Sequence, residues 1–163
     1  MRRAARQKWR RRAWLIISLI LLAGVIGVWL RSLAPMRELR RQAITIAETK
    51  ADVTRVDDFY WDTQRDSYLT VAGRTKAKKR VYVLIRQKTG KVHVLAQSSG
   101  ITQAQVTAQV NTQYAPRRIT SIGLSRRGKK FVWDVGYRTN SGKLGYVTYD
   151  FETGKQLAAI RNL

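Results

Sequence analysis

The stretch that decides the fold occurs twice along the 163 residues: it reads RVYVLIRQKTGKVHVLA at residues 80–96 and LGYVTYDFETGKQLAAI at residues 144–160. Each copy contains an apolar run, a turn that ends in Thr-Gly-Lys, and a second apolar run. A glycine between two such runs can adopt positive φ and is typical of a β-hairpin. We therefore predict antiparallel hairpins around Gly90 and Gly154.

The repetition extends on both sides of the hairpins. A shift of 64 residues aligns Arg74-Thr75 with Arg138-Thr139, and a shift of 57 aligns Ala47 with Ala104. The difference of seven residues predicts an insertion in the first copy, after its helix. Matches in the same order along both copies favour a duplicated unit of about 60 residues. The predicted domains are 35–98 and 99–163.

Each unit is predicted to begin with a helix. In the second unit Thr102 and Gln105 fit a capping box, and Val106, Val110 and Tyr114 recur every four residues on one face. In the first unit, Pro35 suits the start of a helix. The buried stripe expected there is Leu39, Ala43, Ile46, Ala47 and Val53. A helix followed by three or four antiparallel strands, twice, predicts the α+β class.

An apolar segment precedes the two units. Residues 13–30 read AWLIISLILLAGVIGVWL, eighteen residues without a charge, and as a helix they would extend about 27 Å. Seven cations within residues 1–12 predict that this tail stays in the cytoplasm. We expect a single-pass anchor in the cell membrane with the rest of the chain outside. The alternative is a signal peptide cleaved after Ser32-Leu33-Ala34, which Pro35 and the length of the apolar run disfavour.

The charge has to be interpreted with this location in mind. The net charge is +22 and the pI about 11.3, values typical of nucleic-acid binding. Outside the membrane, a basic surface instead attracts an anionic polymer such as teichoic acid, or lipid headgroups. The duplication would allow two basic runs to line one side of the molecule. Their residues are Lys76, Lys78, Lys79, Arg80, Arg126, Arg127, Lys129 and Lys130.

The sequence offers little for catalysis or metal binding. It has no cysteine, no familiar hydrolase or phosphate-binding motif, and one histidine, His93, on a predicted strand. We therefore expect no enzymatic activity and no cofactor, although a serine activated by a lysine stays open. The acidic residues Asp57, Asp58, Asp62 and Asp66 lack the calcium-loop spacing, so solubilising charges are the favoured reading over a calcium site. Asp134, between Trp133 and Val135, is expected to be an ordinary strand residue.

Aromatic side chains give the best candidate for a protein contact. Phe59, Tyr60 and Trp61 are consecutive, and Tyr68 follows shortly after them. Strand alternation sends Tyr60 to one face and its neighbours to the other, so one set belongs to the core. Exposed tyrosine or tryptophan beside arginine is the usual composition of a binding hot spot. Tyr60, Trp61 and Tyr68 are therefore candidate partner-binding residues, with core packing as the alternative.

One apolar segment followed by two helix-and-sheet units resembles the tandem PepSY-like domain proteins. The residues that carry the resemblance are Tyr82-Val83 with Thr89-Gly90-Lys91, Tyr146-Val147 with Thr153-Gly154-Lys155, and Gly100 before the second helix. More closely, the chain resembles the TseB-like (YpmB-like) cell-wall elongation regulators of Gram-positive bacteria. The resemblance implies a cystatin-like fold, no catalytic residues, and a class B penicillin-binding protein as partner.

Three functions follow as expectations. The first is a non-enzymatic, membrane-anchored, extracytoplasmic regulator that binds a peptidoglycan-synthesis enzyme. The second is a module that binds an anionic wall polymer through its basic surface. The third, an inhibitor of an extracellular protease, rests on analogy of fold alone. None of the three involves nucleic acid.

Overall fold

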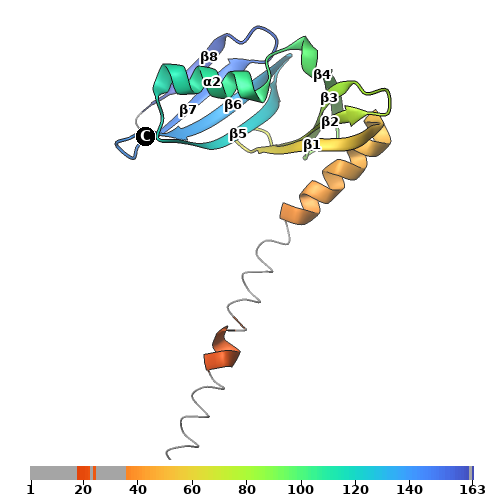
Figure 1. Ribbon diagram of the computed structural model, residues 1–163, viewed down its shortest axis with the longest axis horizontal. Coiled ribbons are helices and arrows are strands. Elements are labelled where there is room, and N and C mark those ends of the chain that lie inside the picture. The colour runs from red at the N-terminus through yellow and green to blue at the C-terminus, as the bar shows by residue number, and fades with distance from the viewer. Residues whose placement is uncertain (1–17, 23, 25–35, 162) are drawn as a thin grey trace, which may run out of the picture. The chain divides into compact units, whose positions relative to one another are not determined.

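The computed structural model describes residues 18–22, 24, 36–161 and 163 (Figure 1). Its strands form two antiparallel sheets of four, each with its strands in sequence order. Sheet A contains β1 (Val53–Asp62), β2 (Tyr68–Thr75), β3 (Arg80–Arg86) and β4 (Val92–Ala96). Sheet B contains β5 (Arg118–Arg127), β6 (Lys130–Arg138), β7 (Leu144–Asp150) and β8 (Gln156–Ile160). A helix over residues 36–51 precedes sheet A, and η1 (Gln97–Ser99) and α2 (Gln103–Tyr114) precede sheet B. The predicted α+β class is confirmed.

The second helix begins as its sequence predicts. The Gln105 backbone N–H donates to the Thr102 hydroxyl at 3.3 Å, and the Gln105 side chain accepts from the Thr102 N–H at 2.8 Å, which completes the capping box. Val106 and Val110 are fully buried. Ala115, with φ of 41°, takes the left-handed conformation that ends the helix.

The two units correspond without an insertion. Strands β3 and β7 begin 64 residues apart, at Arg80 and Leu144. The fully buried helix residues Ala47 and Val110 lie 63 residues apart. The predicted seven-residue insertion is therefore wrong. The match of Ala47 to Ala104 aligned a buried alanine with an exposed one, whereas burial is what makes two helix positions equivalent.

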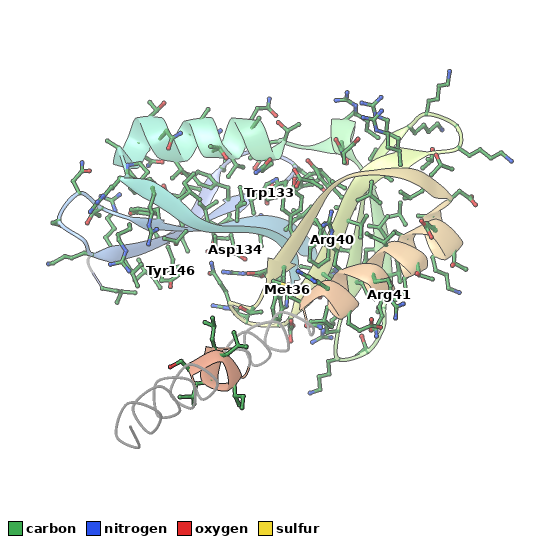
Figure 2. All side chains as sticks on the ribbon, turned by 60° about the horizontal axis from the view of Figure 1, so that its bottom comes forward. Met36, Arg40, Arg41, Trp133, Asp134 and Tyr146 are labelled. Atoms are coloured by element: carbon green, nitrogen blue, oxygen red, sulfur yellow. The ribbon has the colours of Figure 1, made fainter. Side chains whose placement is uncertain are left out.

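Sheet A is buried on both faces. Alternate residues of β2 point to opposite faces, and Tyr68, Leu69, Val71 and Ala72 are nevertheless all at most 5% exposed. Tyr68 and Ala72 belong to the core shared with sheet B. The opposite face lies against residues 40–51 of the helix, which are seen across the strands in Figure 2 and of which Ala47 is fully buried.

An aromatic core joins the two sheets. The ring of Trp133 on β6 lies 5.5 Å from the rings of both Tyr60 and Tyr82 of sheet A, edge-on to each. Tyr82 also meets Phe151 edge-on at 6.0 Å. The Trp133 indole donates to the Ile101 carbonyl at 2.9 Å, so the largest buried side chain also has its polar atom paired. The two sheets therefore share this core, while sheet A also buries residues such as Leu69 and Val71 on its other face.

The predicted N-terminal segments are for the most part not described by the structure. The predicted cytoplasmic tail at residues 1–12 and most of the predicted anchor at residues 13–30 lie outside the described residues. Among those described, no helix is both long and apolar enough to cross a bilayer. The domain boundary between residues 98 and 99 stays a prediction.

Candidate functional site

A groove lies along the face of sheet B that α2 leaves uncovered, where the end of β1 meets that sheet. We call it the Trp61 groove; it encloses about 490 Å³. The residues that define it are Trp61, Asp62, Gly123, Asp134, Tyr146 and Ile160. Figure 2 shows Trp133 on the α2 side of the sheet and Asp134 and Tyr146 on the other side.

Small residues in β5 and β6 create the groove. A Cβ on Gly123 would lie 2.7 Å from the Asp62 Cβ, so only glycine lets β1 approach the sheet this closely. A Cβ on Gly136 would lie 2.5 Å from the Ser121 hydroxyl. The Thr70 hydroxyl of β2 fixes the approach by donating to the Leu124 carbonyl at 2.8 Å. Ser121 and Gly123 are therefore the small residues of β5 that line the groove.

A buried polar cluster lies beneath the groove. Asp134 is 1% exposed and accepts from the Thr148 hydroxyl at 2.6 Å, from the Ser125 hydroxyl at 3.0 Å, and from the Arg127 guanidinium. Asp62, 6% exposed, accepts from the Gln64 backbone N–H at 3.3 Å. Burial, and next the Asp134 carboxylate, raise the pKa of Asp62 above its ordinary value of 3.8. Sequence reasoning missed this cluster; a charge inside the apolar run of β6 was the available signal.

Trp61 is the one predicted partner-binding residue that reaches the surface. Its side chain is 38% exposed, and its indole N–H donates to the Ser67 hydroxyl at 2.9 Å. Tyr60 and Tyr68 are 7% and 4% exposed and belong to the aromatic core. Strand alternation therefore separates Trp61 from Tyr60 as expected. Of these three side chains, Trp61 alone has the exposure that direct contact with a partner would require.

The two basic runs lie at opposite ends of sheet A. The run from Lys76 to Arg80 forms the turn between β2 and β3. The run from Arg126 to Lys130 reaches the other end, where Arg126 lies 3.0 Å from the His93 ring. The Arg127 guanidinium also donates to Gln64 in the turn after β1, at 3.5 Å. They do not line one side of the molecule, because β5 crosses the far end of sheet A.

The runs also differ in how their charges are satisfied. In the second, Arg127 pairs with Asp134, and Lys130 lies 3.3 Å from Asp150. In the first, all four cations are exposed, and no ion pair is seen for them among the described residues. The first run consists of Lys76, Lys78, Lys79 and Arg80. It keeps its charge available for an anionic ligand.

The remaining candidates have structural partners. Asp57 pairs with Arg55 and Arg74 at 3.4 and 3.5 Å, and Asp66 pairs with Arg86 at 2.9 Å. Within the part of the chain that is described, no three metal-ligating side chains gather. His93 stacks edge-on against Phe131, and burial, together with Arg126, lowers the pKa of its imidazole.

Comparison with known proteins finds a match for each of the two units. The family model of the cell wall elongation regulator TseB-like domain matches residues 42–86, and that of the peptidase propeptide and YPEB (PepSY) domain matches residues 100–159. The probable cell wall elongation regulator TseB of Bacillus subtilis (strain 168) is 24% identical over 146 residues, which cover 89% of this chain and 91% of that protein. The solved structure of the YpmB protein from Bacillus subtilis shares the fold, with a TM-score of 0.61 and 23% identity over 74% of this chain and 95% of that one. The chain is thus similar to the TseB/YpmB-like proteins, with a match to the TseB-like domain in its first unit and to the PepSY domain in its second.

Proposed function

We propose that this chain is a non-catalytic, membrane-anchored, extracytoplasmic regulator of cell-wall elongation that binds a class B penicillin-binding protein. The similarity to a probable regulator of cell wall elongation supports the process. The apolar segment at residues 13–30, preceded by seven cations, supports the location.

The observation that carries the proposal is Trp61 at the rim of its groove. An aromatic ring that is part buried, beside an apolar cleft with a few polar groups at its base, is the usual anchor of a protein interface. Ile160, 54% exposed, provides apolar surface on the other side. The groove is open enough to accept a side chain or a loop of a folded partner.

The test uses the full-length chain in detergent as bait for solubilised membranes of the source organism, at low and high salt. We expect capture of a penicillin-binding protein that persists at high salt, because a hot-spot contact is screened little. With the two purified proteins, Trp61→Ala should weaken binding at least tenfold. The matched control is Val94→Ala, which removes a comparably exposed apolar side chain, 47% exposed, from sheet A.

Equal binding by the two variants would remove Trp61 from the interface. Capture of no penicillin-binding protein at either salt concentration would overturn the proposal.

The exposed first basic run favours a second candidate function, binding of an anionic wall polymer. Four cations within five residues, without ion pairs among the described residues, attract polyphosphate chains such as teichoic acid. Such binding should fall steeply with salt, since the Debye length is about 8 Å at physiological ionic strength. Charge reversal at Lys78 and Lys79 should abolish it, whereas reversal at Lys129 should have little effect. If the Lys78/Lys79 variant still binds the polymer, the first basic run is not the polymer-binding site.

A further inference from the structure

The two free sheet edges of this molecule are its two uncharged strands. The outer strands of sheet A are β1 and β4, and those of sheet B are β5 and β8. Strands β1 and β5 contact each other, which leaves β4 and β8 as the free edges. Of the eight described strands, these two alone lack Asp, Glu, Lys and Arg. Proteins normally place charges on edge strands to prevent pairing with another chain, so an uncharged edge in a chain of net charge +22 is unexpected.

Strand β8 is the more open of the two. All five of its side chains are exposed, including Leu157 at 46% and Ile160 at 54%. On β4, by contrast, the sheet B side is covered, because His93 packs against Phe131 and Leu95 packs against the core. An edge strand also directs every second N–H and C=O away from its sheet. β8 therefore presents both unpaired backbone and exposed apolar side chains.

The edge of β8 is continuous with the Trp61 groove. Ile160 pairs with Tyr146 across the ladder, and both line the groove. Pairing resumes beyond Ile160, where Leu163 and Leu144 exchange N–H to carbonyl bonds of 3.0 Å in both directions. A strand added along β8 would place alternate side chains beside Ile160 and Leu163 at the mouth of the groove. The groove and the edge thus form one continuous surface.

The charges at the two ends of β8 indicate which strand it accepts. Lys155 precedes the strand and Arg161 follows it, and both are exposed. In antiparallel pairing of two copies centred on Ala158, Lys155 of each copy would face Arg161 of the other. Like charges directly opposite one another destabilise a strand pair, so self-association is disfavoured. A strand with a carboxylate at each end is favoured instead.

We propose that β8 is a docking edge for an extended segment of a partner protein, which adds to sheet B as a fifth strand and carries carboxylates opposite Lys155 and Arg161. The backbone ladder would supply affinity, while the end charges and the groove would supply selectivity. The proposal rests on the proposed function only for the identity of the partner.

The test uses the full-length chain in detergent and a synthetic peptide of alternating valine and threonine with an aspartate at each end. We expect the peptide to bind and to slow amide hydrogen exchange along Gln156–Ile160 but not along Val92–Ala96. Ala158→Lys should weaken binding at least tenfold, because it adds a charge to an exposed position on the edge. Val94→Lys is the matched control, since it adds the same charge to the exposed β4 edge, and it should leave binding unchanged.

A second variant keeps the test valid if Ala158→Lys disturbs the strand. Reversing both end charges, with Lys155→Glu and Arg161→Glu, should transfer the preference from the aspartate-ended peptide to one ended by lysines. Equal effects of Ala158→Lys and Val94→Lys, protection elsewhere than β8, or no change of preference would overturn the proposal. Dimerisation of the chain that Ala158→Lys abolishes would overturn it too, in favour of a second copy as occupant. If the chain binds the peptide at β8 but captures no penicillin-binding protein, the proposed partner is wrong and the docking edge is still supported.

Discussion

At the scale of single residues, two carboxylates share one guanidinium beneath the Trp61 groove. Arg127 pairs with Asp134, which also receives two hydroxyl donors, whereas Asp62 has one backbone donor at 3.3 Å. The pKa of Asp62 is raised because its carboxylate is buried and lies near the Asp134 carboxylate. The ionised form of Asp62 is therefore a cost to the folded state.

We predict that Asp62→Asn stabilises the protein at neutral pH, by on the order of 1 kcal/mol. Well below its ordinary pKa of 3.8, the Asp62 carboxyl is protonated in both the folded and the unfolded state, so the buried charge costs nothing. As the pH rises through the folded-state pKa, the unfolded state releases its proton first, so the wild type loses this part of its stability. The gain from Asp62→Asn should therefore be present at pH 7 and disappear as the pH falls below the ordinary aspartate pKa of 3.8, as measured by urea unfolding across that range.

Asp66→Asn is the matched control, because its carboxylate is 45% exposed and paired with Arg86. It should change stability at pH 7 by less than about 1 kcal/mol, because an exposed ion pair contributes little. A destabilising effect of Asp62→Asn at pH 7 would show that Asp62 is instead stabilised as an anion.

At the scale of elements, local signals predicted the turns and the second helix but not the course of β1. Gly90 and Gly154 have φ of 66° and 70°, because a tight turn needs a conformation that glycine adopts without a Cβ clash. Strand β1 carries a bulge between Val56 and Asp58, which places Asp57 out of the ladder. Simple alternation does not describe such a strand, so the positions of its aspartates could not be read from spacing.

The cap of α2 gives a prediction at this scale. Thr102→Ala should destabilise the protein by about 1 kcal/mol, because it leaves the Gln105 N–H without its acceptor. Amide exchange should speed up in the first turn of α2 before the rest of the helix. Thr112→Ala, at an exposed position inside the same helix, should be neutral or slightly stabilising, since alanine has the higher helix propensity. If both variants behave alike, the cap contributes nothing to stability.

At the scale of the whole molecule, the sequence predicted two units but not the core between them. The duplication explains two similar sheets, each with its helix. It does not predict that Tyr60 and Tyr82 of one sheet pack on Trp133 of the other, because such contacts depend on how the units meet. The groove was missed for the same reason, since it is formed by β1 together with sheet B. Strand alternation, by contrast, predicted that Tyr60 and Trp61 lie on opposite faces, but not which of the two is exposed.

The shared core predicts that both sheets unfold together. Trp133→Phe removes the indole hydrogen bond to Ile101 and part of the contact with Tyr60 and Tyr82, so it should cost roughly 2–3 kcal/mol. Circular dichroism and fluorescence should follow one coincident transition in both wild type and variant. Trp61→Phe, at an exposed site, should shift that transition by less than about 0.5 kcal/mol. Two separate transitions, with one unaffected by Trp133→Phe, would contradict a common core.

A single core across a duplicated chain also limits how its two halves can evolve. After duplication each copy would normally drift on its own, but here a change at Tyr82 alters the surroundings of both Trp133 and Phe151. Recombination that joined the first half of one lineage to the second half of another would pair rings that had never been selected together. Descendants of this chain should therefore inherit the aromatic positions as a set, while the exposed lysines between β2 and β3 are free to vary singly.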